Sequence, residues 1–282
     1  MKGKVVVITG ALGALGNVVA EEALSRGARV AGIDHAAPQL AATAERIELG
    51  RIDLTDAAQA KKAIDAAAAH FGAIDALVNI AGGFTFETIA DGDLNAWQRM
   101  YTLNAETALN ASRAAIPHLL NSRAARIVNI GAMGALQAGS GMGPYAASKA
   151  GVHKLTESLA AELKGKITVN VVLPSIIDTA ANRPACRRPI PPNGSRRRNS
   201  PMLSFSWQAT PPVPSPARCC RSTDGSDARL RRYQLLKHRP KPNAPLACQR
   251  GGFALRALAV HVARANLSSS RRASAARSET EL

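Results

Sequence analysis

Short apolar runs alternate with longer segments rich in alanine, leucine and glutamate along the first part of the chain. The runs lack the apolar/polar alternation of a strand that faces water on one side, so they predict strands buried on both faces. Buried strands joined by helical crossovers form a parallel sheet with helices on both faces, and the pattern therefore predicts a doubly wound α/β fold. The expected strands span residues 5–9, 29–33, 76–81, 126–130 and 167–173.

A sixth, weaker strand is expected just before Asp53, followed by a helix over residues 56–71. Thr55 directly precedes this helix, and a threonine hydroxyl can accept a hydrogen bond from a free N–H group of the first helical turn. We therefore expect Thr55 to cap the helix. The alternation of strands and helices ends near residue 183, which predicts a single domain over residues 1–183.

The composition changes at the same place. Residues 1–183 contain 17 Lys and Arg against 16 Asp and Glu, whereas residues 184–282 contain 19 against 4, so nearly all of the net charge of +16 lies in the last third. That segment also holds 12 of the 16 prolines and all four cysteines. The cysteines lack the paired spacing of a zinc site or a disulfide framework, and no metal site is predicted. They are Cys186, Cys219, Cys220 and Cys248.

The chain carries no sequence signal for a membrane or for secretion. No run of 18 apolar residues occurs, and Met1 leads into the first strand without an apolar stretch and cleavage site. A transmembrane helix needs about 20 predominantly apolar residues, and a secretory signal needs a cleavable apolar segment. We therefore expect a soluble, cytoplasmic protein with no membrane partner.

A glycine-rich turn joins the first expected strand to the first expected helix. Its glycines let the backbone approach a pyrophosphate at the helix N-terminus. Asp34 closes the second strand, where a carboxylate accepts hydrogen bonds from the adenosine ribose hydroxyls and repels a 2′-phosphate. The sequence therefore predicts a Rossmann-like site that binds NAD in preference to NADP. The cofactor-binding residues expected from this region are Gly10, Leu12, Gly13, Leu15, Gly16 and Asp34.

Further motifs follow in order along the chain. Asp53-Leu54, Asn79-Ile80-Ala81-Gly82 and Pro174-Ser175-Ile176-Ile177-Asp178-Thr179 resemble motifs of the short-chain dehydrogenase/reductase family, and the resemblance extends from Lys4 to about Thr179. Ala14 and Ser175 stand where the commonest family pattern has glycine, and Ile80 where it has asparagine. The resemblance implies further cofactor-binding residues, namely Asp53, Leu54, Asn79, Ala81, Gly82, Pro174, Ile177 and Thr179.

Tyr145 and Lys149 are four residues apart at the start of an alanine-rich helical pattern, which puts their side chains one turn apart on one helix face. A phenol with a pKa of about 10 is a poor base at neutral pH. A nearby ammonium group favours the phenolate, so we expect Tyr145 to be the acid/base and Lys149 to lower its pKa. The resemblance implies that Tyr145 and Lys149 also bind the cofactor, with Lys149 holding the nicotinamide ribose, and that Asn104 holds a proton-relay water.

The resemblance also implies a serine 13 residues before the tyrosine, where its hydroxyl would bind the substrate carbonyl, but this chain has Ala132 there. Loss of one such donor typically costs about 10²- to 10³-fold in rate. We hypothesise that Ser140, the nearest upstream hydroxyl, substitutes for it. The predicted activity is hydride transfer between NAD(H) and a small alcohol/carbonyl substrate, with weakened chemistry. The alternatives are a catalytically silent NAD-binding remnant and a basic-tailed nucleic-acid-binding protein.

Three interpretations fit the basic segment of residues 184–282: a nucleic-acid-binding tail, a disordered tail, or translation out of frame. One choice of codons for residues 201–217, read with two nucleotides dropped, encodes Asp-Ala-Leu-Val-Leu-Leu-Ala-Ser-Asp-Ala-Ala-Ser-Ala-Ile-Thr-Gly, which resembles the ending of family members. Loss of frame near Arg183 is therefore favoured over nucleic-acid binding. By resemblance, it would remove the substrate-side helices, the last strand and much of a homo-oligomer interface.

Overall fold

Six parallel strands form one sheet in the order β3-β2-β1-β4-β5-β6, which is the strand order of a doubly wound Rossmann-like fold. The computed structural model describes residues 1–174 and 177. The predicted fold class is confirmed, and so is the weak strand before Asp53, which is β3. The strands are β1 Val5–Thr9, β2 Arg29–Ile33, β3 Arg46–Leu49, β4 Ala76–Asn79, β5 Arg126–Ile130 and β6 Thr168–Val172.

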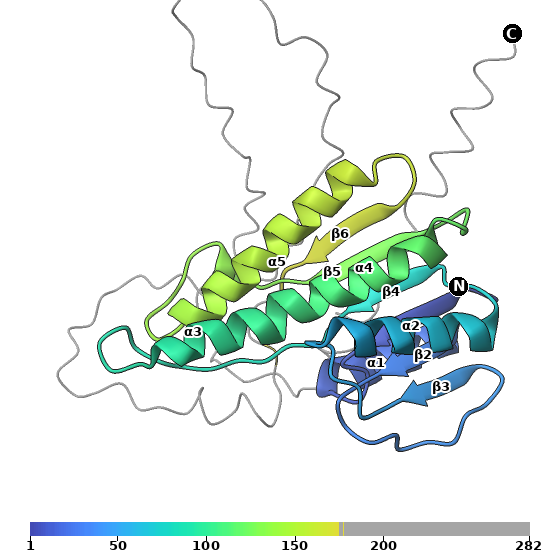
Figure 1. Ribbon diagram of the computed structural model, residues 1–282, viewed down its shortest axis with the longest axis horizontal. Helices are drawn as coiled ribbons and strands as arrows, with labels where there is room; N and C mark the ends of the chain where they lie inside the picture. Colours follow the sequence, from blue (N-terminus) through green and yellow to red (C-terminus); the bar gives the residue numbers. More distant parts are fainter. Residues whose placement is uncertain (175–176, 178–282) are drawn as a thin grey trace, which may run out of the picture.

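Helices cover both faces of the sheet (Figure 1). The faces of α2, α4 and α5 that turn toward the sheet bury Ile64, Leu119 and Leu159 in one apolar core, and α1 packs in a second core on the opposite face. β1 and β5 are buried along their whole length, including the polar Arg126 and Asn129 of β5. The helices are α1 Ala14–Ser25, α2 Ala57–Phe71, α3 Leu94–Tyr101, α4 Thr107–Leu119 and α5 Gly143–Glu162, with a short 3₁₀ turn, η2, at Met133–Ala135.

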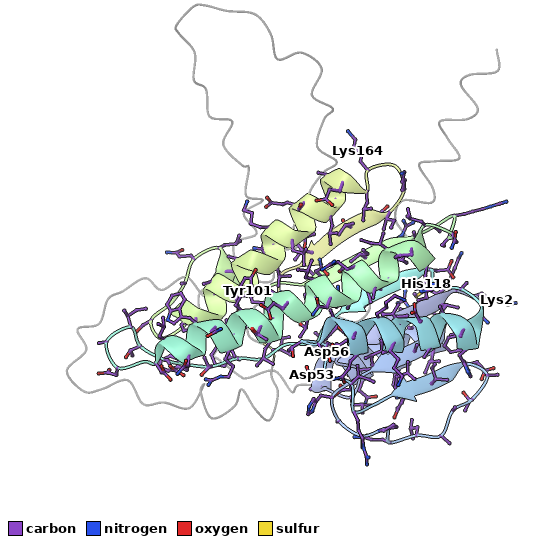
Figure 2. The ribbon with its side chains drawn as sticks, viewed as in Figure 1. Lys2, Asp53, Asp56, Tyr101, His118 and Lys164 are labelled. Atoms are coloured by element: carbon purple, nitrogen blue, oxygen red, sulfur yellow. The ribbon has the colours of Figure 1, made fainter. Side chains whose placement is uncertain are left out.

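Two local predictions are corrected by side-chain hydrogen bonds. Thr55 does not cap α2, because its hydroxyl donates to Asp53, and Asp56 accepts the first-turn N–H groups instead. Figure 2 shows Asp53 and Asp56 together at the amino end of α2. β4 ends at Asn79 rather than at residue 81, since the N–H groups of Ile80 and Ala81 turn away from the sheet to the Thr9 hydroxyl.

A π-helical turn interrupts the long helical segment between residues 94 and 119. The turn, η1 (Thr102–Glu106), joins α3 to α4 without a break and contains the buried Asn104. A π turn adds one residue to a helical turn and changes which side chains face inward. The described part of the chain has no helix that is long and apolar enough to cross a membrane.

Candidate active site

The loops after β1 and β4 meet at the carboxyl edge of the sheet, where the strand order reverses. Both N–H groups that follow β4 donate to the Thr9 hydroxyl, at 3.1 and 3.2 Å. Gly10 lies so close to this loop that a Cβ atom at residue 10 would be 2.8 Å from the Ala81 nitrogen. Open α/β sheets bind their ligands at such a reversal point. Gly10, Ala81 and Gly82, predicted from separate motifs, therefore belong to one site.

The turn between β1 and α1 has the backbone that a phosphate group requires. Gly10 adopts a left-handed conformation with φ of 66°, and a Cβ on Gly16 would overlap the Gly10 carbonyl oxygen. Gly13 precedes α1 and no side chain caps the helix, so N–H groups of its first turn are free to bind an anion. Leu15 is buried in the core behind the turn. The residues present thus fit the pyrophosphate of a dinucleotide.

Asp34 connects the glycine-rich turn to the end of β2. One carboxylate oxygen accepts the Leu12 N–H at 2.9 Å, and the other accepts the Ala36 N–H at 3.0 Å. A carboxylate has about four lone-pair sites, so both oxygens retain capacity for a ligand hydroxyl. Asp34 therefore shapes the turn directly, in addition to any contact with a ribose.

Asp53, Leu54 and Asn79, which the resemblance implies as cofactor-binding residues, have different surroundings in the structure. Asp53 accepts both the N–H and the hydroxyl of Thr55, and these bonds hold the pKa of its carboxyl below the usual value. Leu54 is buried. Asn79 is buried too, and its amide donates to Asn129 and Ser112 inside the core. The Asn79 side chain thus ties β4 to β5 and α4, and this residue supports the cofactor loop from behind.

Asn104 fastens the loop after β4 to two helices. Its side chain accepts the Gly83 N–H and donates to the Gly83 carbonyl, both at 3.1 Å, and it donates to the Ser148 hydroxyl at 3.0 Å. Gly82 has no room for a Cβ because the Asn104 side chain occupies that space. Ser148, buried next to Lys149, was not among the predicted residues. Its only sequence signal is its place inside the Tyr-x-x-x-Lys motif.

Tyr145 and Lys149 lie one turn apart on α5, as predicted. Lys149 is buried, and its ammonium donates to the Ile130 carbonyl at the end of β5, at 2.8 Å. Burial lowers the pKa of Lys149 to about 8. Burial also raises the pKa of Tyr145. Desolvation disfavours the charged phenolate, so the phenol is protonated at neutral pH. That Lys149 favours the phenolate once the nicotinamide is bound stays a prediction.

An aromatic ring that the sequence did not predict covers Tyr145. Phe84, from the loop after β4, meets the tyrosine ring edge to face with centroids 5.0 Å apart. Phe84 itself is exposed to solvent. Phe84 comes two residues after the Asn79-Ile80-Ala81-Gly82 motif, but no sequence pattern there indicates a contact with Tyr145.

Ala132 is buried in the segment that leads from β5 to η2. Its backbone is extended, with φ of −157° and ψ of 145°. Ser140, the hypothesised substitute, is exposed in the segment before α5, and no hydrogen bond joins it to Tyr145 within the described residues. Pro174 accepts the Met133 N–H, and Ile177 packs against the second core. Thr179, Ser175 and residues 184–282 lie outside the described residues.

The groups at this edge of the sheet come from separate segments of the chain, and a dinucleotide and a carbonyl substrate are the ligands that they suit. Within residues 1–174 and 177, no group of three or more His, Cys, Asp or Glu side chains could hold a metal ion.

Comparisons with known proteins agree with this geometry. Residues 4–188 match the sequence model described as short chain dehydrogenase. A 3-oxoacyl-[acyl-carrier-protein] reductase of Escherichia coli strain K12 is 32% identical over 189 residues, which cover 64% of this chain and 77% of the relative.

Two solved structures are similar as well. The ligand-free aldohexose dehydrogenase of Thermoplasma acidophilum has a TM-score of 0.60 and 33% identity, over 65% of this chain and 71% of that one. Carveol dehydrogenase of Mycobacterium avium, in complex with NAD, has a TM-score of 0.59 and 28% identity, over 64% and 74%.

Proposed function

Since the chain belongs to the short-chain dehydrogenase family, we propose that it is an oxidoreductase that binds NAD and interconverts an alcohol and a carbonyl compound. The observation that carries this proposal is the pair Tyr145 and Lys149 on one face of α5, beside the loop that Asn104 fixes. When bound, the nicotinamide supplies or accepts the hydride. The residues of the chain supply the proton and the alignment.

Tyr145 acts as the acid in the reduction of the carbonyl. As the carbonyl carbon gains a hydride, its oxygen takes the phenolic proton, which leaves an alcohol and a phenolate. The raised pKa of Tyr145 keeps the phenol protonated for this step. Lys149, whose pKa of about 8 leaves it charged at pH 7, stabilises the phenolate that forms. Asn104 holds the loop at Gly83 in place, and we propose that it also positions a water that returns the proton.

Asp34 supports the choice of NAD over NADP. Its carboxylate stands at the end of β2 and is fixed by two backbone N–H groups. A fixed negative charge there accepts ribose hydroxyls and repels a 2′-phosphate. We propose a dissociation constant for NADH at least about tenfold lower than for NADPH, which corresponds to about 1.4 kcal/mol.

A titration of fluorescence combined with turnover assays tests the proposal. NADH and NADPH are titrated into the full-length protein, and NADH oxidation is followed with a panel of ketones and aldehydes. Tyr145→Phe should bind NADH like the wild type and lose turnover, because it keeps the ring and removes the proton. Failure of the wild type to bind NADH would refute the proposal.

Ala132 favours one alternative, a catalytically silent NAD-binding protein, because the residue offers no hydroxyl to a substrate carbonyl. The same assays separate the two: the silent protein binds NADH but oxidises it with no member of the panel. The proposed domain ends near residue 183, and the family match, which ends at residue 188, supports that boundary. A cytoplasmic location and a lost homo-oligomer interface remain predictions.

A further inference from the structure

The segment that contains Ala132 is tied down by three successive backbone N–H groups. Gly131 donates to the carbonyl of Val172 at 2.9 Å, and Met133 donates to the carbonyl of Pro174 at 2.9 Å. Between them, the Ala132 N–H donates to a side chain, the Nε2 atom of His153, at 3.3 Å. The outer two bonds join this segment to β6 and the residues after it. The middle bond joins it to α5.

The His153 ring packs directly against the backbone of Gly131, next to the residue whose N–H it accepts. A Cβ on Gly131 would overlap the His153 ring, and it would also be 2.8 Å from the Leu173 side chain. Only glycine at residue 131 therefore lets the imidazole reach the backbone of Ala132. His153 lies one helical turn beyond Lys149 and two turns beyond Tyr145, so all three side chains project from one region of α5.

We propose that His153 is a positioning residue, which holds the Ala132 segment in the conformation that the reaction at Tyr145 requires by accepting the Ala132 N–H. The inference rests on the proposed function and extends it. Since residue 132 has no hydroxyl, the placement of this segment against the substrate depends on its backbone. A misplacement of about 1 Å far from the chemistry can cost about 10²-fold in rate.

The bond requires a neutral imidazole with its proton on Nδ1, because a protonated ring has two donors and no acceptor. The charged groups that act on His153 are Lys149, Lys154 and Glu157, all on α5. Residues 130–134 and 168–174, the described segments that pack against it from β5, η2 and β6, contain no ionisable side chain. Burial, and next the charge of Lys149, lower the pKa of His153 below 6.5, which favours the neutral ring.

Two variants test whether the His153 hydrogen bond holds the Ala132 segment, and His70→Gln is the control for the loss of an exposed histidine. His153→Gln places an amide oxygen where Nε2 lies and cannot titrate, whereas His153→Leu fills the space without an acceptor. Hydrogen exchange at pH 7.5 should show protection of the Ala132 amide in the wild type, in His70→Gln and in His153→Gln. In His153→Leu the protection should be lost. Equal protection in the leucine variant would overturn the inference.

The pH profile of carbonyl reduction gives a second readout. Tyr145 stays protonated at low pH and so produces no acid limb in this direction. The wild type should lose kcat/KM as the pH falls below 6.5, with the midpoint below that value, because His153 becomes protonated. His153→Gln should be flat over the same range, and His153→Leu should be about tenfold or more slower throughout. An acid limb that persists in His153→Gln would overturn the inference.

The two experiments also distinguish the failure of this inference from that of the proposed function. If the wild type shows no turnover but His153→Leu loses protection of the Ala132 amide, the proposed function is refuted and the role of the His153 hydrogen bond is supported. Turnover by the wild type without any change in His153→Leu would refute that role and leave the proposed function standing.

Discussion

Ala132 is buried, and it stands where the family resemblance implies a serine whose hydroxyl binds the substrate carbonyl. Ala132→Ser should therefore raise kcat by about 10²-fold, since one well-placed donor to a developing oxyanion contributes about that much. Steady-state rates with NADH and one ketone measure the effect. The comparison variant is Ser140→Ala, which should lower turnover if Ser140 substitutes for the missing hydroxyl. Unchanged turnover in Ser140→Ala would end the Ser140 hypothesis.

Lys149, which we propose as an active-site residue, also lowers the stability of the folded protein. Its pKa falls from 10.5 to about 8 on burial, so the folded state holds its proton less tightly than the unfolded state does. The buried charge therefore destabilises the protein below pH 8, by about 3 kcal/mol for a shift of this size. This penalty declines as the pH rises from 8 toward 10.5.

Lys149→Met should accordingly be more stable than the wild type at pH 7 by up to about 3 kcal/mol, and this advantage should shrink by pH 9.5. Urea unfolding at the two pH values measures it. The variant should lose turnover, because Lys149 stabilises the phenolate. A methionine variant less stable than the wild type at pH 7 would show that the Ile130 contact outweighs the desolvation of the ammonium.

The chemistry of single residues was largely predictable from spacing, whereas the balance of forces on them was not. The four-residue interval of Tyr145 and Lys149 placed both on one helix face, as predicted. The pKa of Tyr145 depends on how deeply the phenol is buried, and Phe84 lies too far along the chain for any local pattern to indicate that contact.

Among the elements, the turn between β1 and α1 gives the sharpest prediction. Gly10→Ala should destabilise the protein by more than the roughly 1–2 kcal/mol of a left-handed alanine, because the new Cβ would also be 2.8 Å from the Ala81 nitrogen. Gly165→Ala is the matched control, with a φ of 80° and nothing within 4 Å of the added Cβ. Urea unfolding of both variants separates the contact from the strain. Equal losses would contradict the close approach of the two loops.

Element boundaries show where sequence patterns lose their power. Apolar runs located five of the six strands, and the weaker β3 was expected only from its place before Asp53. The end of β4 depends on Thr9, a residue 71 positions earlier, whose hydroxyl draws the next two N–H groups out of the sheet. The π turn at Asn104 has no signature in the 3.6-residue period. Asp56 rather than Thr55 caps α2, because the Thr55 hydroxyl donates to Asp53 instead.

At the scale of the whole molecule, the face of the sheet on which α1 packs bears on the interpretation of residues 184–282. Val78, Val128, Ile130 and Val172 line this face over β4, β5 and β6. The single helix that the described part of the chain places there, α1, packs against β1 and β2. An apolar sheet face needs a covering layer. The peptide encoded out of frame by residues 201–217 contains an apolar helical pattern and a strand entry, and such elements form a covering layer in this fold class.

Restoring the frame near codon 183 tests this interpretation. The restored protein should give a higher soluble yield and faster NADH-dependent turnover than the chain as it stands, because by the family resemblance the restored ending supplies the substrate-side helices and the last strand of the sheet. The nucleotide sequence around codon 183 is the first measurement, and expression of both forms with the same ketone panel is the second. Two results would contradict the frameshift: equal yield and turnover of the two forms, or a gene whose alternative frame encodes no family-like ending. Residues 184–282 would then be a basic segment with a role of its own.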